Sequence, residues 1–165
     1  MYILTIFLSY SFFGFIFETI VSLVTGGKLN SGIMFGPWTP IYGFGVLIML
    51  FLKKQLKKLN LKKYQEIIVF FLSIVVILSL LEQAGGMLLD KVFHKTLWDY
   101  SNLKFHITKY IALEISLGWG LGAIIIGYII HPKLKKYFQK MPFVITAIAA
   151  LIFSIDAIIT FLKYV

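Results

Sequence analysis

Four carboxylates lie within the apolar stretches of this 165-residue chain, where an acid is unusual enough to suggest chemistry. They are Glu18, Glu82, Glu114 and Asp156. A carboxylate in hydrocarbon is costly unless it faces a partner, a water-filled cavity or protein interior, so it marks a functional site by default. Protons, a metal cation or an amine could each neutralise such acids, and the sequence leaves these alternatives open.

The stretches that carry these acids are long enough to be membrane helices. Hydrophobic residues make up 59% of the chain, and its mean hydropathy is +0.90. About twenty helical residues cross a hydrocarbon core of about 30 Å. We therefore expect an all-α, polytopic integral membrane bundle in one transmembrane domain, residues 1–165. About five spans are predicted, at 2–24, 33–52, 67–89, 107–130 and 143–162.

The second predicted span has an irregular start. The segment 30–45 reads NSGIMFGPWTPIYGFG, and Gly and Pro interrupt regular helix. We expect this span to be broken or re-entrant there. Two interpretations stay open: a structured binding loop that dips into the bundle, or a surface turn followed by a kinked helix.

Lysines predict the orientation of the chain in the cell membrane. Ten lie in the segments 53–63 and 133–140, against four in the segments 26–40 and 90–106. Short loops rich in lysine stay on the cytoplasmic side. The N-terminus is then cytoplasmic and the C-terminus outside, and all four acids fall into one layer of the outer half. The lysine loops could dock an acidic partner or anionic lipid.

Several classes of function find no motif in the sequence. There is no cysteine, and His94 and His106 are too widely spaced to predict a metal site. Neither a nucleophile elbow nor a phosphate-binding loop occurs, so no catalytic residue and no cofactor is assigned, and an enzyme is not favoured. The lysines are explained by orientation, so nucleic acid is not an expected partner.

Two further segments carry specific expectations. Asp99, Ser101 and Asn102 are turn formers within the outer segment 93–106, beside the interfacial aromatic Trp98. In the fourth span, the pair Gly118–Gly122 has the spacing that lets helices approach closely. We expect this pair to pack inside the monomer, and a homodimer or a larger complex remains open as well.

The chain also resembles a known family. The shared elements are Gly14-Phe15-x-x-Glu18, Asn30-x-Gly32-x-x-x-Gly36-Pro37-x-x-Pro40-Ile41-Tyr42-Gly43-x-Gly45, Glu82, Trp98-Asp99-Tyr100-Ser101 and Ser116-x-x-Trp119-Gly120. They are similar to those of the CmpB-like family, labelled putative ABC-transporter permease (type IV). The resemblance covers about residues 10–132. It implies a small polytopic membrane protein that serves as a transport component, and an ATPase subunit becomes a candidate partner.

Together these observations predict a permease-like subunit with an acidic pocket in the outer half. The pocket would bind and translocate a small polar or cationic solute. Its predicted binding residues are Glu18, Tyr42, Glu82, Trp98, Asp99, Glu114 and Trp119. Two alternatives remain: an intramembrane enzyme that acts on a lipid or lipid-linked substrate with a carboxylate and His106, or a membrane scaffold or regulator whose acids hold the bundle together.

Overall fold

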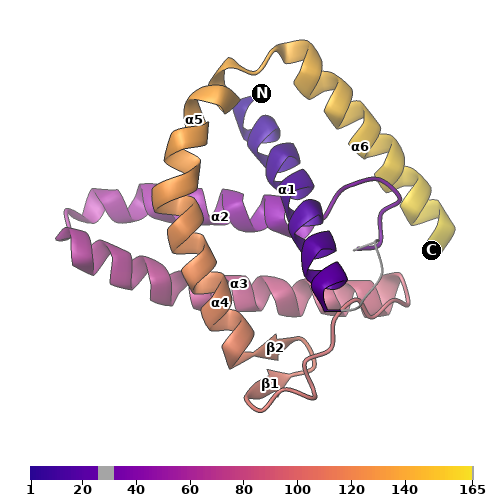
Figure 1. Ribbon diagram of the computed structural model, residues 1–165, viewed down its shortest axis with the longest axis horizontal. Coiled ribbons are helices and arrows are strands. Elements are labelled where there is room, and N and C mark those ends of the chain that lie inside the picture. The colour runs from indigo at the N-terminus through magenta and orange to yellow at the C-terminus, as the bar shows by residue number, and fades with distance from the viewer. Residues whose placement is uncertain (26–31, 165) are drawn as a thin grey trace.

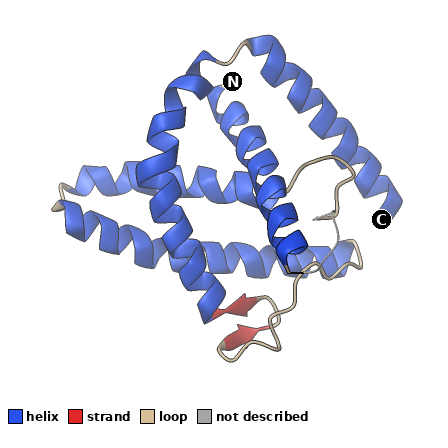
Figure 2. Cartoon of the chain, viewed as in Figure 1, coloured by secondary structure: helices blue, strands red, loops and turns tan. Residues whose placement is uncertain are grey.

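The computed structural model describes residues 1–25 and 32–164, and within them helices dominate (Figure 2). The predicted all-α bundle is confirmed. Lys28 and Asn30, two residues of the predicted outer segment, lie outside the described residues. The helices are α1 (Tyr2–Val24), α2 (Pro40–Leu56), η1 (Lys57–Leu59), α3 (Lys63–Val92), α4 (Leu113–Ile124), η2 (Ile125–Ile130), α5 (His131–Lys140) and α6 (Phe143–Tyr164), and the strands are β1 (His106–Thr108) and β2 (Ile111–Ala112).

The helices form a bundle around one main apolar core. Helices α2 and α3 run side by side as an antiparallel hairpin, while α1 packs on α2 and α4 packs on α3 (Figure 1). Helix α6 diverges from the others and touches the bundle chiefly through α1 (Figure 1). The centre of the core is fully buried at Phe70 and Ile74 of α3 and at Met49 of α2.

Among the residues that the structure describes, four helical segments are long and apolar enough to cross a membrane. They are Tyr2–Val24, Lys63–Val92, Leu113–Lys140 and Phe143–Tyr164, the third of which joins α4, η2 and α5 without a break. Helix α2 has 17 residues, so it is roughly 26 Å long and falls just short of a full span. The protein is therefore a membrane protein with four span-capable segments and one shorter apolar helix.

The start of the second apolar segment is not helical, as its glycines and prolines predict. Residues 32–37 form bends, and α2 begins only at Pro40, which occupies its first turn. Gly32 has a φ of +96°, a conformation that other residues rarely adopt. Proline suits the first turn of a helix because the missing N–H would have no partner there.

The predicted start of the fourth span needs correction. Residues 107–112 were expected to be helical, but they belong to a two-stranded antiparallel hairpin that pairs His106 with Ala112 and Thr108 with Ile111. The β-branched residues Ile107, Thr108 and Ile111 favour extended backbone, and apolar composition alone does not separate the two structures. Helix α4 consequently begins six residues later, at Leu113.

The expected packing of Gly118 and Gly122 is also wrong for the monomer. A Cβ atom added at either glycine would meet nothing within 4 Å. The glycine that packs closely is Gly120, where a Cβ would lie 2.6 Å from Phe71 and 2.7 Å from Val75 of α3. The four-residue spacing of Gly118 and Gly122 suggested that their side of α4 packs against another helix. The packed side is the opposite one, which carries Gly120.

The segment Ile125–Ile130 is a π-helix between α4 and α5. The N–H of His131 donates to the Ile126 carbonyl, five residues earlier. The next donor in this register would be Pro132, which has no N–H, so the Gly127 carbonyl would lack a partner. The ammonium group of Lys53 on α2 donates to this carbonyl instead. Pro132 thus accounts for the irregular turn, and Lys53 supplies the missing donor.

Candidate functional site

Glu18 on α1 is held by Tyr42 from the first turn of α2. The Tyr42 ring lies over Gly14, where an added Cβ would come within 2.4 Å of the ring. Glu18 follows Gly14 by four residues and therefore lies on the same face of α1, one turn further on. The Tyr42 hydroxyl donates a hydrogen bond to the Glu18 carboxylate. The spacing of Gly14 and Glu18 thus makes a slot for the ring and an acceptor for its hydroxyl.

Glu82 on α3 is buried, with 4% of its surface exposed. Its Oε1 accepts a hydrogen bond of 3.0 Å from the hydroxyl of Tyr100, in the segment between α3 and β1. Trp119 of α4 lies close to Glu82, and its ring packs edge-on against Tyr42 at 5.3 Å between centroids. Side chains from α2, α3, α4 and the outer segment therefore converge on this acid.

Glu18 and Glu82 belong to one electrostatic environment that they share with two tyrosines. The two carboxyl groups are close enough to interact electrostatically, and both also interact with Tyr42 and Tyr100. Within the described part of the chain, the buried atoms Glu82 Oε2 and Trp119 Nε1 make no hydrogen bond of ordinary geometry, although the indole N–H and the carboxyl group lie beside one another. A buried polar atom left unpaired costs about 1–3 kcal/mol, so a small shift that joins these two groups, or a bound molecule, would satisfy both.

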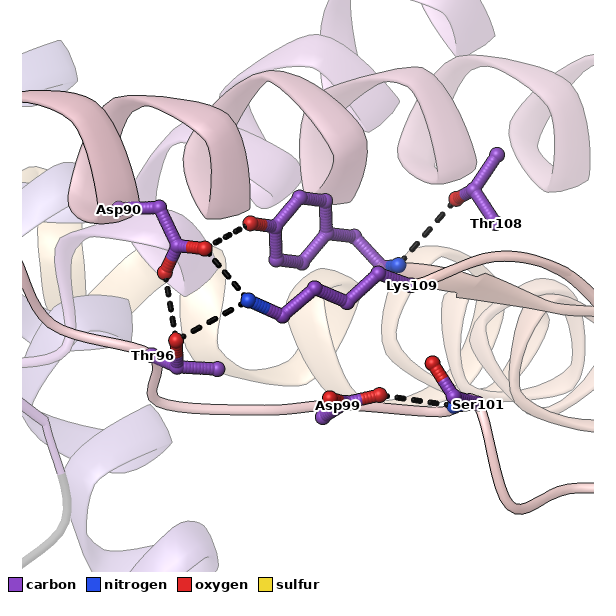
Figure 3. A network of polar contacts seen from close by, with 7 residues as sticks. Asp90, Thr96, Asp99, Ser101, Thr108 and Lys109 are labelled. Carbon is purple, nitrogen blue, oxygen red and sulfur yellow. Dashed lines mark hydrogen bonds and ion pairs between the residues drawn. The ribbon is translucent and has the colours of Figure 1, made fainter.

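A network of polar contacts centred on Asp90 lies at the end of α3 (Figure 3). The carboxylate of Asp90 accepts hydrogen bonds from Lys109 at 2.5 Å and from Thr96 at 2.7 Å, and also from the hydroxyl of Tyr110. The Asp90 carboxylate raises the pKa of the Lys109 ammonium group, chiefly through their hydrogen bond. The N–H of Tyr100 donates to the Lys109 carbonyl at 2.8 Å. Tyr100 therefore connects the Asp90–Lys109 pair to Glu82, to which its hydroxyl donates.

The outer-segment residues Trp98 and Asp99 have different surroundings. Trp98 lies against Gly85, three residues after Glu82, and its buried Nε1 has no partner among the described residues. Asp99 is exposed, and its carboxylate accepts a hydrogen bond of 2.9 Å from the N–H of Ser101 (Figure 3). Hydrogen bonds from Ser101 lower the pKa of Asp99. Trp98 therefore borders the Glu82 region, whereas Asp99 forms the turn that its sequence predicts.

Glu114 and Asp156, the other two acids, each bind loop backbone. Glu114 is exposed in the first turn of α4, and its Oε1 accepts a hydrogen bond of 3.1 Å from the N–H of Phe105. Asp156 of α6 accepts hydrogen bonds from the N–H groups of Phe35 and Gly36, at 3.0 and 2.8 Å. The expected depth of Glu114 depended on a helix start at residue 107, and the later start places it at the helix end.

Two grooves lie away from the Glu18–Glu82 pair. One, of about 450 Å³, is lined by Phe35, Gly36 and Asp156 with three isoleucines of α6. The other, of about 520 Å³, lies between α1, α2 and Phe153 of α6 and is lined by apolar side chains. Among residues 1–25 and 32–164, no three His, Asp or Glu side chains come together as metal ligands.

The predicted binding residues did not include four on which the site depends, namely Tyr100, Lys109, Asp90 and Gly86. Tyr100 was visible within the Trp98–Ser101 element, but the polar Asp99 beside it appeared the better binding residue. Lys109 forms an ion pair with Asp90 across the outer segment. Asp90 and Gly86 repeat the spacing of Glu18 and Gly14, since Tyr110 packs over Gly86 and donates to Asp90. The repeated Gly-x-x-x-acid spacing is the sequence feature from which both tyrosine–carboxylate contacts could have been predicted.

Comparison with known proteins places the chain in one family. Neither the curated proteins nor the solved structures compared with it gave a match. A family model matches residues 5–162, which is nearly the whole chain, and its description is "Putative ABC-transporter type IV". The match covers all the helices that build the site as well as the outer segment. The chain belongs to this ABC-transporter type IV family of membrane proteins.

Proposed function

We propose that the protein is a permease-like transporter subunit that binds a small polar or cationic solute at Glu18 and Glu82. The observation that carries this proposal is that Tyr42, which donates to Glu18 of α1, packs against Trp119, which lies beside the buried Glu82 of α3. Two carboxylates joined by such aromatic contacts in a membrane bundle are costly to keep as unbalanced negative charges. A proton neutralises the pair when the site is empty, and a cationic solute replaces that proton when it binds.

The aromatic side chains around the pair support a cationic ligand. Tyr42 and Trp119 contact one another, and Tyr100 donates to Glu82. Tyrosine and tryptophan rings attract cations such as ammonium groups, most strongly where water is excluded. The unpaired Nε1 atom of Trp98 would bind an acceptor on the same solute, such as a hydroxyl or carbonyl oxygen.

The remaining assignments extend the same proposal. The lysine-rich ends of α2, α3 and α5 would face the cytoplasm in the cell membrane, which puts the carboxylate pair in the outer half. An ATPase subunit would bind on that cytoplasmic side, as membership of an ABC-transporter family suggests. The non-helical residues 32–39 before α2 would let Tyr42 move away from Glu18 during transport.

A scaffold or regulator is the second candidate, and specific contacts favour it. Glu114 and Asp156 each hold a loop to a helix through backbone N–H groups. Asp90 holds the outer segment to the end of α3 through the side chains of Thr96 and Lys109. If Glu18 and Glu82 had the same structural role as these three acids, they would serve only to hold Tyr42 and Tyr100 by hydrogen bonds. The two candidates differ in whether a solute stabilises the protein through Glu82.

A thermal-stability screen of purified protein distinguishes these functions. The wild type, Glu82→Gln and the matched variant Glu114→Gln are heated with metal cations, amines, amino acids and polyamines. A ligand at one hundred times its Kd adds about 2.7 kcal/mol of stability. We expect one cationic compound to raise the Tm of the wild type and of Glu114→Gln but not that of Glu82→Gln. The scaffold is favoured if no compound acts and Glu82→Gln alone lowers the Tm.

A further inference from the structure

A second polar cluster lies on the opposite, lysine-rich side of the bundle and has no part in the proposed solute site. It consists of Lys53 on α2, Lys63 and Glu66 on α3, and Tyr128 in the π-helix. The ammonium groups of Lys53 and Lys63 lie 3.9 and 4.2 Å from the centroid of the Tyr128 ring. Two cations therefore converge on one ring from separate helices.

The cluster has an excess of positive charge. Glu66 supplies one carboxylate, which accepts a hydrogen bond of 2.7 Å from Tyr128 and lies 3.7 Å from Lys63. Lys57 follows Lys53 by four residues, and its backbone continues the helical conformation of α2, so it lies one turn further along the same face. With Lys57 the cluster has three ammonium groups and one carboxylate. Ammonium groups gathered around one ring repel one another unless an anion lies between them. The cluster is thus suited to a ligand that carries at least one negative charge.

Its position favours an anion that belongs to a lipid. Phe51 and Ile129, neighbours of Lys53 and Tyr128 in the chain, are 63% and 50% exposed. Such apolar side chains face acyl chains in a membrane protein. The side chain of Lys63 is 65% exposed and is free to move toward a ligand. The cluster therefore lies where the apolar surface ends, which is the level of lipid phosphate groups.

We propose that Lys53, Lys57 and Lys63 bind the phosphate of an anionic phospholipid beside Tyr128. Ammonium groups bind phosphate as point charges, which suits a phosphodiester that can approach in several orientations. The Tyr128 ring attracts the ammonium groups of Lys53 and Lys63, and the Glu66 carboxylate orients the Tyr128 hydroxyl group. Lys53 keeps its contact with the Gly127 carbonyl, so a bound lipid would be linked to the irregular turn before Pro132.

The test is native mass spectrometry of the detergent-purified full chain with phosphatidylglycerol, phosphatidylcholine or inorganic phosphate. We expect one phosphatidylglycerol to bind, with much weaker binding of phosphatidylcholine and inorganic phosphate. A lysine near anionic lipid contributes about a fivefold change in affinity, so Lys63→Gln should weaken binding by about that factor. The control Lys136→Gln removes the same charge from an exposed position on α5 and should change little.

Three outcomes would overturn the proposal. Equal weakening by Lys63→Gln and Lys136→Gln would mean that lipids respond only to total charge. Inorganic phosphate that binds as tightly as the lipid would assign the cluster to a soluble anion. No preference for phosphatidylglycerol over phosphatidylcholine would remove the site altogether. Because Lys63 is largely exposed, the variant should fold, and its Tm without lipid checks this.

Discussion

Replacement of Gly43 by alanine should destabilise the protein more than any other conservative change at its helix contacts. A Cβ at this position would lie 2.4 Å from Ser11 Oγ and 2.7 Å from both the ring and the backbone carbonyl of Phe7. A side chain can rotate away, but a backbone carbonyl can move only if α1 and α2 separate. Overpacking of this kind costs about 1–3 kcal/mol and sometimes more.

The matched control for this prediction is Gly118→Ala. Both glycines are helical, but at Gly118 the added Cβ meets nothing within 4 Å. Alanine favours helix over glycine by about 0.5–1 kcal/mol, so this variant should be as stable as the wild type or slightly more stable. Equilibrium unfolding in mixed micelles measures both. Equal stability changes in the two variants would contradict the close contact of α1 with α2.

The second large effect is expected at Lys53. In Lys53→Met the Gly127 carbonyl loses its donor, and a buried acceptor without a partner costs about 1–3 kcal/mol. The loss should be smaller in a Pro132→Ala background, because residue 132 then has an N–H that can donate to the preceding turn. We therefore expect the free energies of unfolding of the two changes to be non-additive, with Pro132→Ala reducing the cost of Lys53→Met.

A double-mutant cycle measures this coupling. Wild type, Lys53→Met, Pro132→Ala and the double variant are unfolded under one set of conditions. The contact of Lys53 with the Tyr128 ring is lost equally in both backgrounds, so the cycle isolates the carbonyl. An interaction free energy of zero would show that Lys53 does not compensate for Pro132.

Much of the fold follows from composition, and the irregular parts do not. The first predicted span coincides with α1, and the interrupted start before α2 follows from its glycines and prolines. The hairpin of residues 106–112 was missed because isoleucine and threonine suit a strand as well as a membrane helix. The packed side of α4 was missed because Gly118, Gly120 and Gly122 look alike in sequence, and only the position of Phe71 separates them.

The candidate site was likewise predicted in part: its main residues were identified from the sequence, but several of its contacts were not. Glu18, Tyr42, Glu82 and Trp119 were predicted as binding residues, and the structure brings them together, although their function is a proposal. Local spacing could not show that Tyr100 would bond to Glu82, because the contact depends on the Asp90–Lys109 pair. Nor could it show that Asp156 would bind Phe35 and Gly36, which are more than one hundred residues away.

The central claim is that Glu18 and Glu82 share one site, protonated when empty and occupied by a cationic solute when filled. Labelling with dicyclohexylcarbodiimide tests it directly, because this reagent adds to protonated carboxyl groups in apolar surroundings. Mass spectrometry of the digested protein then identifies the modified acid. We expect labelling at Glu82 or Glu18 that falls when the stabilising cationic compound is present, while exposed Glu114 is unaffected by it. Labelling of the pair that no cationic compound reduces, or a pair that never reacts, would contradict the claim.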